Sequence, residues 1–324
     1  MSDIQVSIII VLYNSNMIKA ERTIKSAVSQ KNIDFEIIVS DDGSKDDPTD
    51  NIISIFKKYN FTNYKININP QNLGTVKNIL SALKLSRGKY VYCISPGDMI
   101  YDDNTINYFF QFAEENDACV CFGNYYDYKM VDEKSQIIGR ISSSARTPFY
   151  CEKKSFTMYK LLIMFGEGIL GPAFFRERNY ALKYIGQVSE VSKYVEDNTS
   201  VICSLVDKVP IYYYDKKICW YECDTGISRM ENSEWSTRIF DDFRKTFELL
   251  IKQYPKDTIL RAVYKRRYSK ENDGKLFSVL VLLIRHPIAC FKRSFLKQGK
   301  QCTISEKEKY LLGEELKLKL SILD

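Results

Sequence analysis

The chain has 324 residues, of which 45% are hydrophobic, and a formal net charge of +6. This length supports a large buried core, and the modest charge does not indicate a nucleic-acid partner. The nine cysteines show no Cys-x-x-Cys spacing, so we expect buried thiols in a reducing compartment. The first residues lack the pattern of a secretory signal, and these features together predict a cytoplasmic protein.

Strand and helix patterns alternate from residue 4 to about residue 123. Runs of β-branched and aromatic residues predict strands at residues 6–12, 35–40, 64–68, 90–94 and 118–122. Apolar residues at helical spacing predict helices at residues 18–30, 49–59, 74–86 and 104–115. Such alternation is typical of an α/β fold, a mostly parallel sheet with helices on both faces. Ligands of these sheets bind beyond the carboxyl ends of the strands.

The pattern is less regular after about Tyr125. Residues 180–205 are helical in parts, and residues 211–221 favour an extended strand. From Trp235 onward the sequence is mostly helical, and residues 231–324 hold 20 Lys and Arg against 13 Asp and Glu. We therefore place a boundary near Arg229, between residues 1–229 and a basic helical region, 230–324.

Polar residues follow the first three predicted strands. The first strand ends in Leu12-Tyr13-Asn14, and the second is followed by Asp41-Asp42-Gly43-Ser44. A carboxylate there can accept hydrogen bonds from a base or a ribose, although Asp-Gly-Ser is also common in turns. The segment Asn72–Asn78 opens a helix and carries Lys77 near its start, an arrangement that suits a phosphate group.

The fourth predicted strand leads into Ser95-Pro96-Gly97-Asp98. An acidic side chain at this position is able to hold a divalent cation that neutralises the charge of a leaving diphosphate.

The order and spacing of these motifs resemble the family 2 glycosyltransferases, which have the GT-A fold. The resemblance covers about Gln5–Asn124 well and continues more thinly to Arg229. It implies an inverting enzyme that moves a hexosyl or N-acetylhexosaminyl group from a nucleotide-diphosphate sugar, UDP-linked by default. The acceptor is expected to be a hydroxyl of a glycan or a lipid-linked molecule, in bacterial surface polysaccharide biosynthesis. A dehydrogenase is excluded, since no Gly-x-Gly-x-x-Gly follows the first strand.

The resemblance also implies roles for individual residues. Asp42 is expected to hold the base of the nucleotide with Tyr13 beside it, and Lys77 is a candidate for the diphosphate. The Glu196-Asp197 pair matches the family's Glu-Asp pair, which makes Asp197 the general base. The donor-binding residues implied in total are Leu12, Tyr13, Asn14, Asp42, Asn72, Lys77 and Asp98. The turn Gly168–Pro172 is expected under the acceptor, unless it is a plain strand-entry turn, and Tyr221–Ser228 resembles a segment that closes the donor site.

The metal motif departs from the family. Members read Asp-x-Asp-Asp where this chain reads Ser95-Pro96-Gly97-Asp98, so only Asp98 remains. We favour a Mg²⁺ or Mn²⁺ ion held by Asp98, with the diphosphate and waters as its other ligands. Two alternatives stay open: a metal-independent enzyme that uses Lys77 or another cation, and a catalytically weak protein that binds another glycosyltransferase.

Apolar and basic residues interleave near the C-terminus. Residues 261–300 hold eleven Lys or Arg and two acids, and the apolar stretch Leu276–Ile284 lies among them. This composition favours peripheral contact with an anionic membrane, at the inner face of the cell membrane. Helices that pack on the catalytic domain are the alternative. His286, the single histidine, is given no role.

Overall fold

The computed structural model describes residues 4–132, 134–140, 160–166, 168–223, 233–268, 275–291 and 305–323. In these residues the strands form one nine-stranded sheet, in the order β3-β2-β1-β4-β8-β6-β9-β5 with β7 paired to β6. The strands are β1 (Val6–Leu12), β2 (Phe35–Asp41), β3 (Tyr64–Ile68), β4 (Tyr90–Ile94), β5 (Met99–Ile100), β6 (Val120–Val131), β7 (Lys134–Arg140), β8 (Phe174–Glu177) and β9 (Tyr212–Glu222). The α/β fold predicted from the sequence is confirmed.

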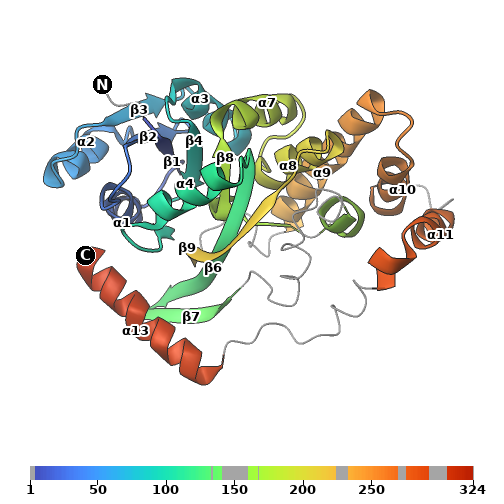
Figure 1. Ribbon diagram of the computed structural model, residues 1–324. Helices are drawn as coiled ribbons and strands as arrows, with labels where there is room; N and C mark the ends of the chain where they lie inside the picture. The colour runs from blue at the N-terminus through green and yellow to red at the C-terminus, as the bar shows by residue number, and fades with distance from the viewer. Residues whose placement is uncertain are drawn as a thin grey trace.

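The helices surround this sheet (Figure 1). They are α1 (Met17–Val28), α2 (Thr49–Lys58), α3 (Thr75–Leu85), α4 (Thr105–Glu115), α7 (Arg178–Val188), α8 (Asp197–Val206), α9 (Ser233–Gln253), α10 (Thr258–Arg267), α11 (Lys275–Arg285) and α13 (Glu306–Leu323), with short turns η1 (Lys160–Met164) and η2 (Gly171–Ala173). All four helices predicted in the first third are present, within one or two residues of their expected ends.

The first half of the sheet is parallel. Strand β1 pairs in parallel with β2 and β4, and β2 pairs in parallel with β3. The isoleucines Ile8, Ile9 and Ile10 of β1 have no exposed surface, because helices cover both faces of the sheet. Continuous β-branched runs are therefore favoured in these strands. The carboxyl ends of β1, β2 and β4 meet at one edge, where the predicted site residues lie.

The second half of the sheet is mixed. Strand β8 pairs antiparallel with β4 and β6, β5 pairs antiparallel with β9, and β6 turns back into β7. The strand predicted at residues 118–122 continues to Val131, and β8 was not predicted. Aromatic and polar residues interleave along β6, and most of them are buried. The strand therefore lacks the alternation of apolar and polar residues that would mark it in the sequence.

The C-terminal helices pack on the rest of the chain at two places. Helix α9 packs on α8, and α13 runs alongside β7 (Figure 1). On α13 a row of leucines joins Met99, Tyr128 and Trp220 in a second apolar cluster, through Leu312, Leu316, Leu320 and Leu323. The predicted boundary near Arg229 lies outside the described residues. No described helix is both long enough and apolar enough to cross a membrane.

The cysteines of the described residues are free thiols. Five of them are buried, as expected: Cys93, Cys121, Cys203, Cys219 and Cys223. Cys119 is exposed instead, since it precedes the first residue of β6 at the surface end of that strand.

Candidate functional site

Asp42 connects the end of β2 to the start of α3. Its backbone N–H donates to the carbonyl oxygen of Leu12, at 2.9 Å. Its buried carboxylate accepts hydrogen bonds from the backbone N–H groups of Leu73 and Gly74, each at 2.9 Å. The carboxylate thus fixes the turn that opens α3. Asn72 in this turn and Lys77 in the first turns of the helix are exposed to solvent.

The loops after β1 and β2 are held together by side chains. The N–H of Asn14 donates to Ser44 Oγ at 2.7 Å, and Asn14 Oδ1 accepts from the N–H of Lys45 at 3.0 Å. Asn14 lies in the left-handed region with φ +46°. Tyr13 stays 50% exposed beside this pair, so its ring is accessible to a stacked base. Leu12 is buried and offers only its backbone to a ligand.

An open cavity of about 480 Å³ lies on the α1 and α2 side of this edge, lined by Leu12, Asn14, Asp41 and residues 44–48 among others. Three acids, Asp41, Asp46 and Asp47, line it against one lysine, Lys45, and this negative balance disfavours a phosphate there. Asp42 faces the other side, toward α3. The phosphates of a nucleotide therefore fit the α3 side, where backbone N–H groups and Lys77 lie.

Glu196 and Asp197 lie where α8 begins, with Glu196 as the residue before the first helical position. A Cβ atom placed on Gly171 would lie 3.5 Å from Glu196 Oε1 and 3.6 Å from Asp197 Oδ2. Both carboxylates therefore lie beside the Gly168–Pro172 turn. Asn198 fixes the turn to α8, because its side chain both accepts from the N–H of Ile169 and donates to its carbonyl, at 2.9 and 3.0 Å.

The charge on this pair is controlled by burial and by one arginine. Burial, followed by the neighbouring Asp197 carboxylate, raises the pKa of Glu196, and burial raises the pKa of Asp197. Arg176 opposes both shifts. A carboxylate whose pKa lies closer to neutrality is a better general base at neutral pH than an ordinary aspartate. Burial and Arg176 therefore act on the ionisation of this pair in opposite directions.

Arg176 was not predicted from the sequence. It lies on β8 opposite Val91 of β4 and Val120 of β6 and is 2% exposed. Its Nη2 atom lies 3.9 Å from Glu196 Oε1, and its guanidinium lies over the ring of Phe174. Within the described residues, its Nε and Nη2 atoms have no hydrogen-bond partner. A buried guanidinium with free donors next to a carboxylate pair is the second unusual feature of this region.

Asp98 has different surroundings. Its side chain is buried, and Oδ1 accepts the backbone N–H of Glu222 at 3.1 Å. Its carbonyl oxygen accepts from the hydroxyl of Thr23 at 2.7 Å. Burial, together with the nearby carboxylates of Glu222 and Asp127, raises the pKa of Asp98 well above its usual range. The neutral form of this carboxyl group is therefore favoured.

Glu222 takes the space that the family motif gives to an aspartate. Gly97 has φ +99°, and a Cβ atom on it would lie 2.0 Å from Glu222 Oε2. The other carboxylate oxygen of Glu222 is paired with Lys19 Nζ at 2.7 Å. Among the described residues, no group of three or more His, Cys, Asp or Glu side chains is arranged to hold a metal. The expected ion needs only Asp98 from the protein, with the diphosphate and waters as its other ligands, so it stays a prediction.

The segment expected to close the donor site is only partly described. Tyr221 and Glu222 belong to β9, whereas residues 224–228 lie outside the described residues.

Solved glycosyltransferases share this fold. The structure of S. aureus TarS 1-349 matches 88% of this chain and 77% of its own, with a TM-score of 0.56 and 20% identity. TarS 1-349 has also been solved in complex with UDP-GlcNAc, with a TM-score of 0.55 to this chain. The mannosyltransferase PcManGT of Pyrobaculum calidifontis, in complex with GDP-Man and Mn²⁺, matches 98% of this chain and 80% of its own, at a TM-score of 0.57 and 13% identity.

Sequence comparisons point the same way. An uncharacterized glycosyltransferase of Rickettsia felis is 34% identical over 44% of this chain and 22% of its own length. Glycosyltransferase GlyG of Streptococcus pneumoniae serotype 4 is 27% identical over 39% of this chain and 41% of its own length. The chain thus spans less than half of the length of these relatives. The model of the family "Glycosyl transferase family 2" matches residues 7–170, just over half of the chain. The chain belongs to glycosyl transferase family 2.

Proposed function

We propose that the chain transfers a hexosyl or N-acetylhexosaminyl group from a UDP-sugar to an acceptor hydroxyl, with inversion at the anomeric carbon. The observation that carries this proposal is the Glu196-Asp197 pair beside the Gly168–Pro172 turn, with the buried Arg176 next to it. The UDP-GlcNAc complex of TarS supports a UDP-linked donor.

In the proposed reaction Asp197 accepts the proton of the acceptor hydroxyl. The hydroxyl oxygen forms the new bond to the anomeric carbon while the bond from that carbon to the diphosphate oxygen breaks. The electron pair of the broken bond leaves on the nucleotide diphosphate. Glu196 shares the charge of the pair, and Arg176 lowers the pKa of both acids, which favours their ionised forms against the effect of burial.

The leaving diphosphate needs positive charge or oriented donors. Lys77 and the N–H groups at the start of α3 supply both, because Asp42 holds that turn in place. Tyr13 is proposed to stack on the base. A divalent cation is not assigned a step here; if one is bound, Asp98 would be its protein ligand and it would add positive charge at the leaving diphosphate.

Donor binding tests the proposal before any acceptor is known. The melting temperature of the full chain is measured with UDP, UDP-glucose, UDP-GlcNAc and GDP-mannose, each with and without Mn²⁺. A ligand at about 100 times its Kd stabilises the folded state by about 2.7 kcal/mol, which raises the melting temperature by several degrees. We expect UDP and a UDP-sugar to do so. If no nucleotide sugar raises the melting temperature, the proposed function is wrong.

We further propose that the acceptor is lipid-linked, at the inner face of the cell membrane, in surface polysaccharide biosynthesis. Helix α11 packs on α10 through Ser278 and Leu282 and exposes its other apolar side chains. Those exposed by more than two thirds on α11 and just beyond it are Leu276, Phe277, Ile284, Ile288 and Phe291. Lys275 and Arg285 bound the helix, a combination that suits the interface of an anionic bilayer.

Vesicle sedimentation tests the membrane proposal. We expect the full chain to sediment with phosphatidylglycerol vesicles and not with phosphatidylcholine vesicles. The double substitution Phe277→Ser and Ile284→Ser should reduce sedimentation at least threefold, because each apolar group loses its transfer energy. The matched control, Tyr310→Ser and Leu311→Ser on the exposed face of α13, should sediment like the unaltered chain. No binding to either vesicle by the unaltered chain contradicts this proposal.

A further inference from the structure

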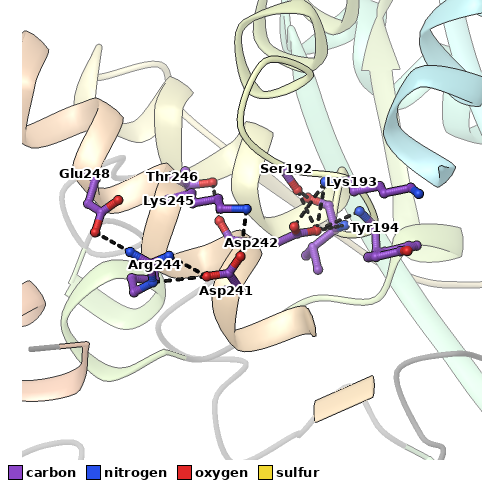
Figure 2. A network of polar contacts seen from close by, with 10 residues as sticks. Ser192, Lys193, Tyr194, Asp241, Asp242, Arg244, Lys245, Thr246 and Glu248 are labelled. Atoms are coloured by element: carbon purple, nitrogen blue, oxygen red, sulfur yellow. Dashed lines mark hydrogen bonds and ion pairs between the residues drawn. The ribbon is translucent and has the colours of Figure 1, made fainter. Parts of the chain in front are cut away.

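A buried aspartate of the C-terminal region holds the segment that leads into the carboxylate pair. Asp242 lies on α9 and is 4% exposed. Its carboxylate accepts hydrogen bonds from Ser192 Oγ at 2.9 Å and from the N–H groups of Lys193, Tyr194 and Val195 at 3.0, 2.6 and 3.1 Å (Figure 2). Three successive backbone N–H groups thus converge on one charged group.

This arrangement is a strong anchor. Hydrogen bonds to an ionised acceptor are shorter and stronger than neutral ones, and successive N–H groups form a concave site for an anion. Asp242 is desolvated, so the same hydrogen bonds replace the water it has lost. The backbone from Ser192 to Val195 therefore has one favourable conformation as long as the carboxylate is present.

The anchored segment ends directly at the carboxylate pair. Val195 precedes Glu196, and its carbonyl oxygen accepts a hydrogen bond from the hydroxyl of Thr199. Thr199 lies in the first turn of α8, so the segment is fixed to the helix that carries Asp197. Any shift of residues 193–195 moves Glu196 and Asp197 against the Gly168–Pro172 turn.

The same segment contacts the donor side. The carbonyl oxygen of Lys193 accepts the N–H of Val76 on α3, at 3.2 Å. The Lys193 side chain lies against Gly74, where a Cβ atom would be 2.4 Å from Lys193 Cγ. Asp42 holds Gly74 from the other side. Residues 192–195 thus lie between the turn that is proposed to bind the diphosphate and the proposed base.

We infer that Asp242 is a positioning residue, which acts on sugar transfer by fixing Glu196 and Asp197 relative to the donor. This inference rests on the proposed function. The neighbouring Asp241 provides a contrast on the same helix, because it pairs with Arg244 and Lys245 in partly exposed ion pairs (Figure 2). Such pairs contribute little to stability, and they touch neither the segment nor the carboxylate pair.

The test begins with Asp242→Asn in the full chain, with Asp241→Asn as the matched control. The amide keeps the shape of the side chain but has one acceptor oxygen and no charge. We expect hydrogen exchange at the amides of residues 193–195 to become faster in Asp242→Asn and to stay unchanged in Asp241→Asn. Unchanged exchange in Asp242→Asn overturns the inference.

Turnover is then measured with the nucleotide sugar that gives the largest thermal shift. We expect Asp242→Asn to lower kcat about 10- to 100-fold, as for a displacement of a reacting group by about 1 Å, and to change the donor KM less than about threefold. In a chain that already carries Asp197→Asn, Asp242→Asn should cause no further loss, because residues that act as a unit are not additive. If the losses in kcat from Asp197→Asn and Asp242→Asn multiply, the inference is wrong. It is also wrong if kcat is unchanged although hydrogen exchange at residues 193–195 is faster.

A milder variant keeps the test decisive if Asp242→Asn does not fold. Ser192→Ala removes one of the hydrogen bonds to Asp242, and we expect kcat to fall about twofold to fivefold while the melting temperature falls by only a few degrees. An unchanged kcat in Ser192→Ala contradicts the positioning role. If the unaltered chain turns over no nucleotide sugar, the proposed function fails instead, and the exchange rates alone decide whether Asp242 fixes this segment.

Discussion

The two acidic regions of the site differ in what surrounds them. Glu196 and Asp197 lie at the start of α8 beside a glycine turn, with a buried guanidinium near them. Asp98 lies under β9, where Glu222 donates its N–H to it and fills the space beside Gly97. Burial raises the pKa of the acids in both regions.

This difference shows that a raised pKa does not by itself identify a catalytic acid. Near Glu196 and Asp197 a cation opposes the shift, and the turn at Gly171 lies directly against both carboxylates. Near Asp98 further carboxylates add to the shift, and the side chain is covered by protein. We therefore interpret the first region as catalytic and the second as structural. The predictions below test this contrast.

Among the variants that keep the base itself, the largest effect is expected from Arg176→Met. The guanidinium lowers the pKa of both Glu196 and Asp197, so its removal raises them. The base must be ionised, and the acidic limb of kcat/KM against pH should therefore move to higher pH, by about 1 to 3 units for the loss of one close opposite charge. Below that limb the rate should fall about tenfold for each unit.

The control for this change is Arg178→Met, whose Nε donates to Ser86 Oγ away from the pair. Its pH profile should match that of the unaltered chain. An unmoved acidic limb in Arg176→Met, in a protein that still melts cooperatively, would show that the arginine does not control the pair.

A smaller effect is expected from Lys77→Ala on the donor side. A charge-assisted contact to a phosphate contributes about 1.5 kcal/mol, so the Kd for UDP should rise about tenfold. Calorimetric titration with UDP measures this. Lys84→Ala, at the other end of α3, removes an equal charge far from the start of the helix and should leave the Kd unchanged. Equal weakening of UDP binding by both variants would indicate that the positive charge of α3 acts at long range, without a direct contact between Lys77 and a phosphate.

The smallest effect is expected at the second acidic region. Because the pKa of Asp98 is raised in the folded protein, its ionisation costs stability as the pH rises. Asp98→Asn needs no proton and can still accept the N–H of Glu222. We expect its melting temperature at pH 7 to equal or exceed that of the unaltered chain, and EDTA to lower UDP binding less than about twofold. A clear loss of UDP binding in EDTA would show that a metal ion takes part and would support Asp98 as its ligand.

The sequence predicts the parallel half of the fold because its strands are continuous apolar runs separated by amphipathic helices. The hairpin of β6 and β7 and the short β8 are stabilised by pairing between distant segments, which leaves little periodicity in the chain. Four residues of β8 carry too little local signal to be separated from a turn.

The site residues divide in the same way, into those that local motifs predict and those that only the fold brings together. Asp42 and the Glu196-Asp197 pair lie in motifs that can be recognised from their order. Arg176 lies close to the pair only because β8 pairs with β4 and β6 in this register. Asp242 reaches residues 192–195 from a helix that begins about 40 residues later, and Glu222 meets Gly97 from the far end of β9. Asp242 belongs to no motif of the sequence, and the segment Tyr221–Ser228 indicates a role for Glu222 at the donor site without indicating its contact with Gly97.

The most direct test of the contrast is nucleotide release by Asp197→Asn and Asp98→Asn, measured side by side with the UDP-sugar that binds best. We expect Asp197→Asn to lose about 100- to 10,000-fold in rate with the donor still bound, since it lacks the base. Asp98→Asn should keep its rate within about threefold, in EDTA as well as in Mn²⁺. Retained turnover in Asp197→Asn, or a comparable loss in Asp98→Asn, would contradict the assignment of the two regions.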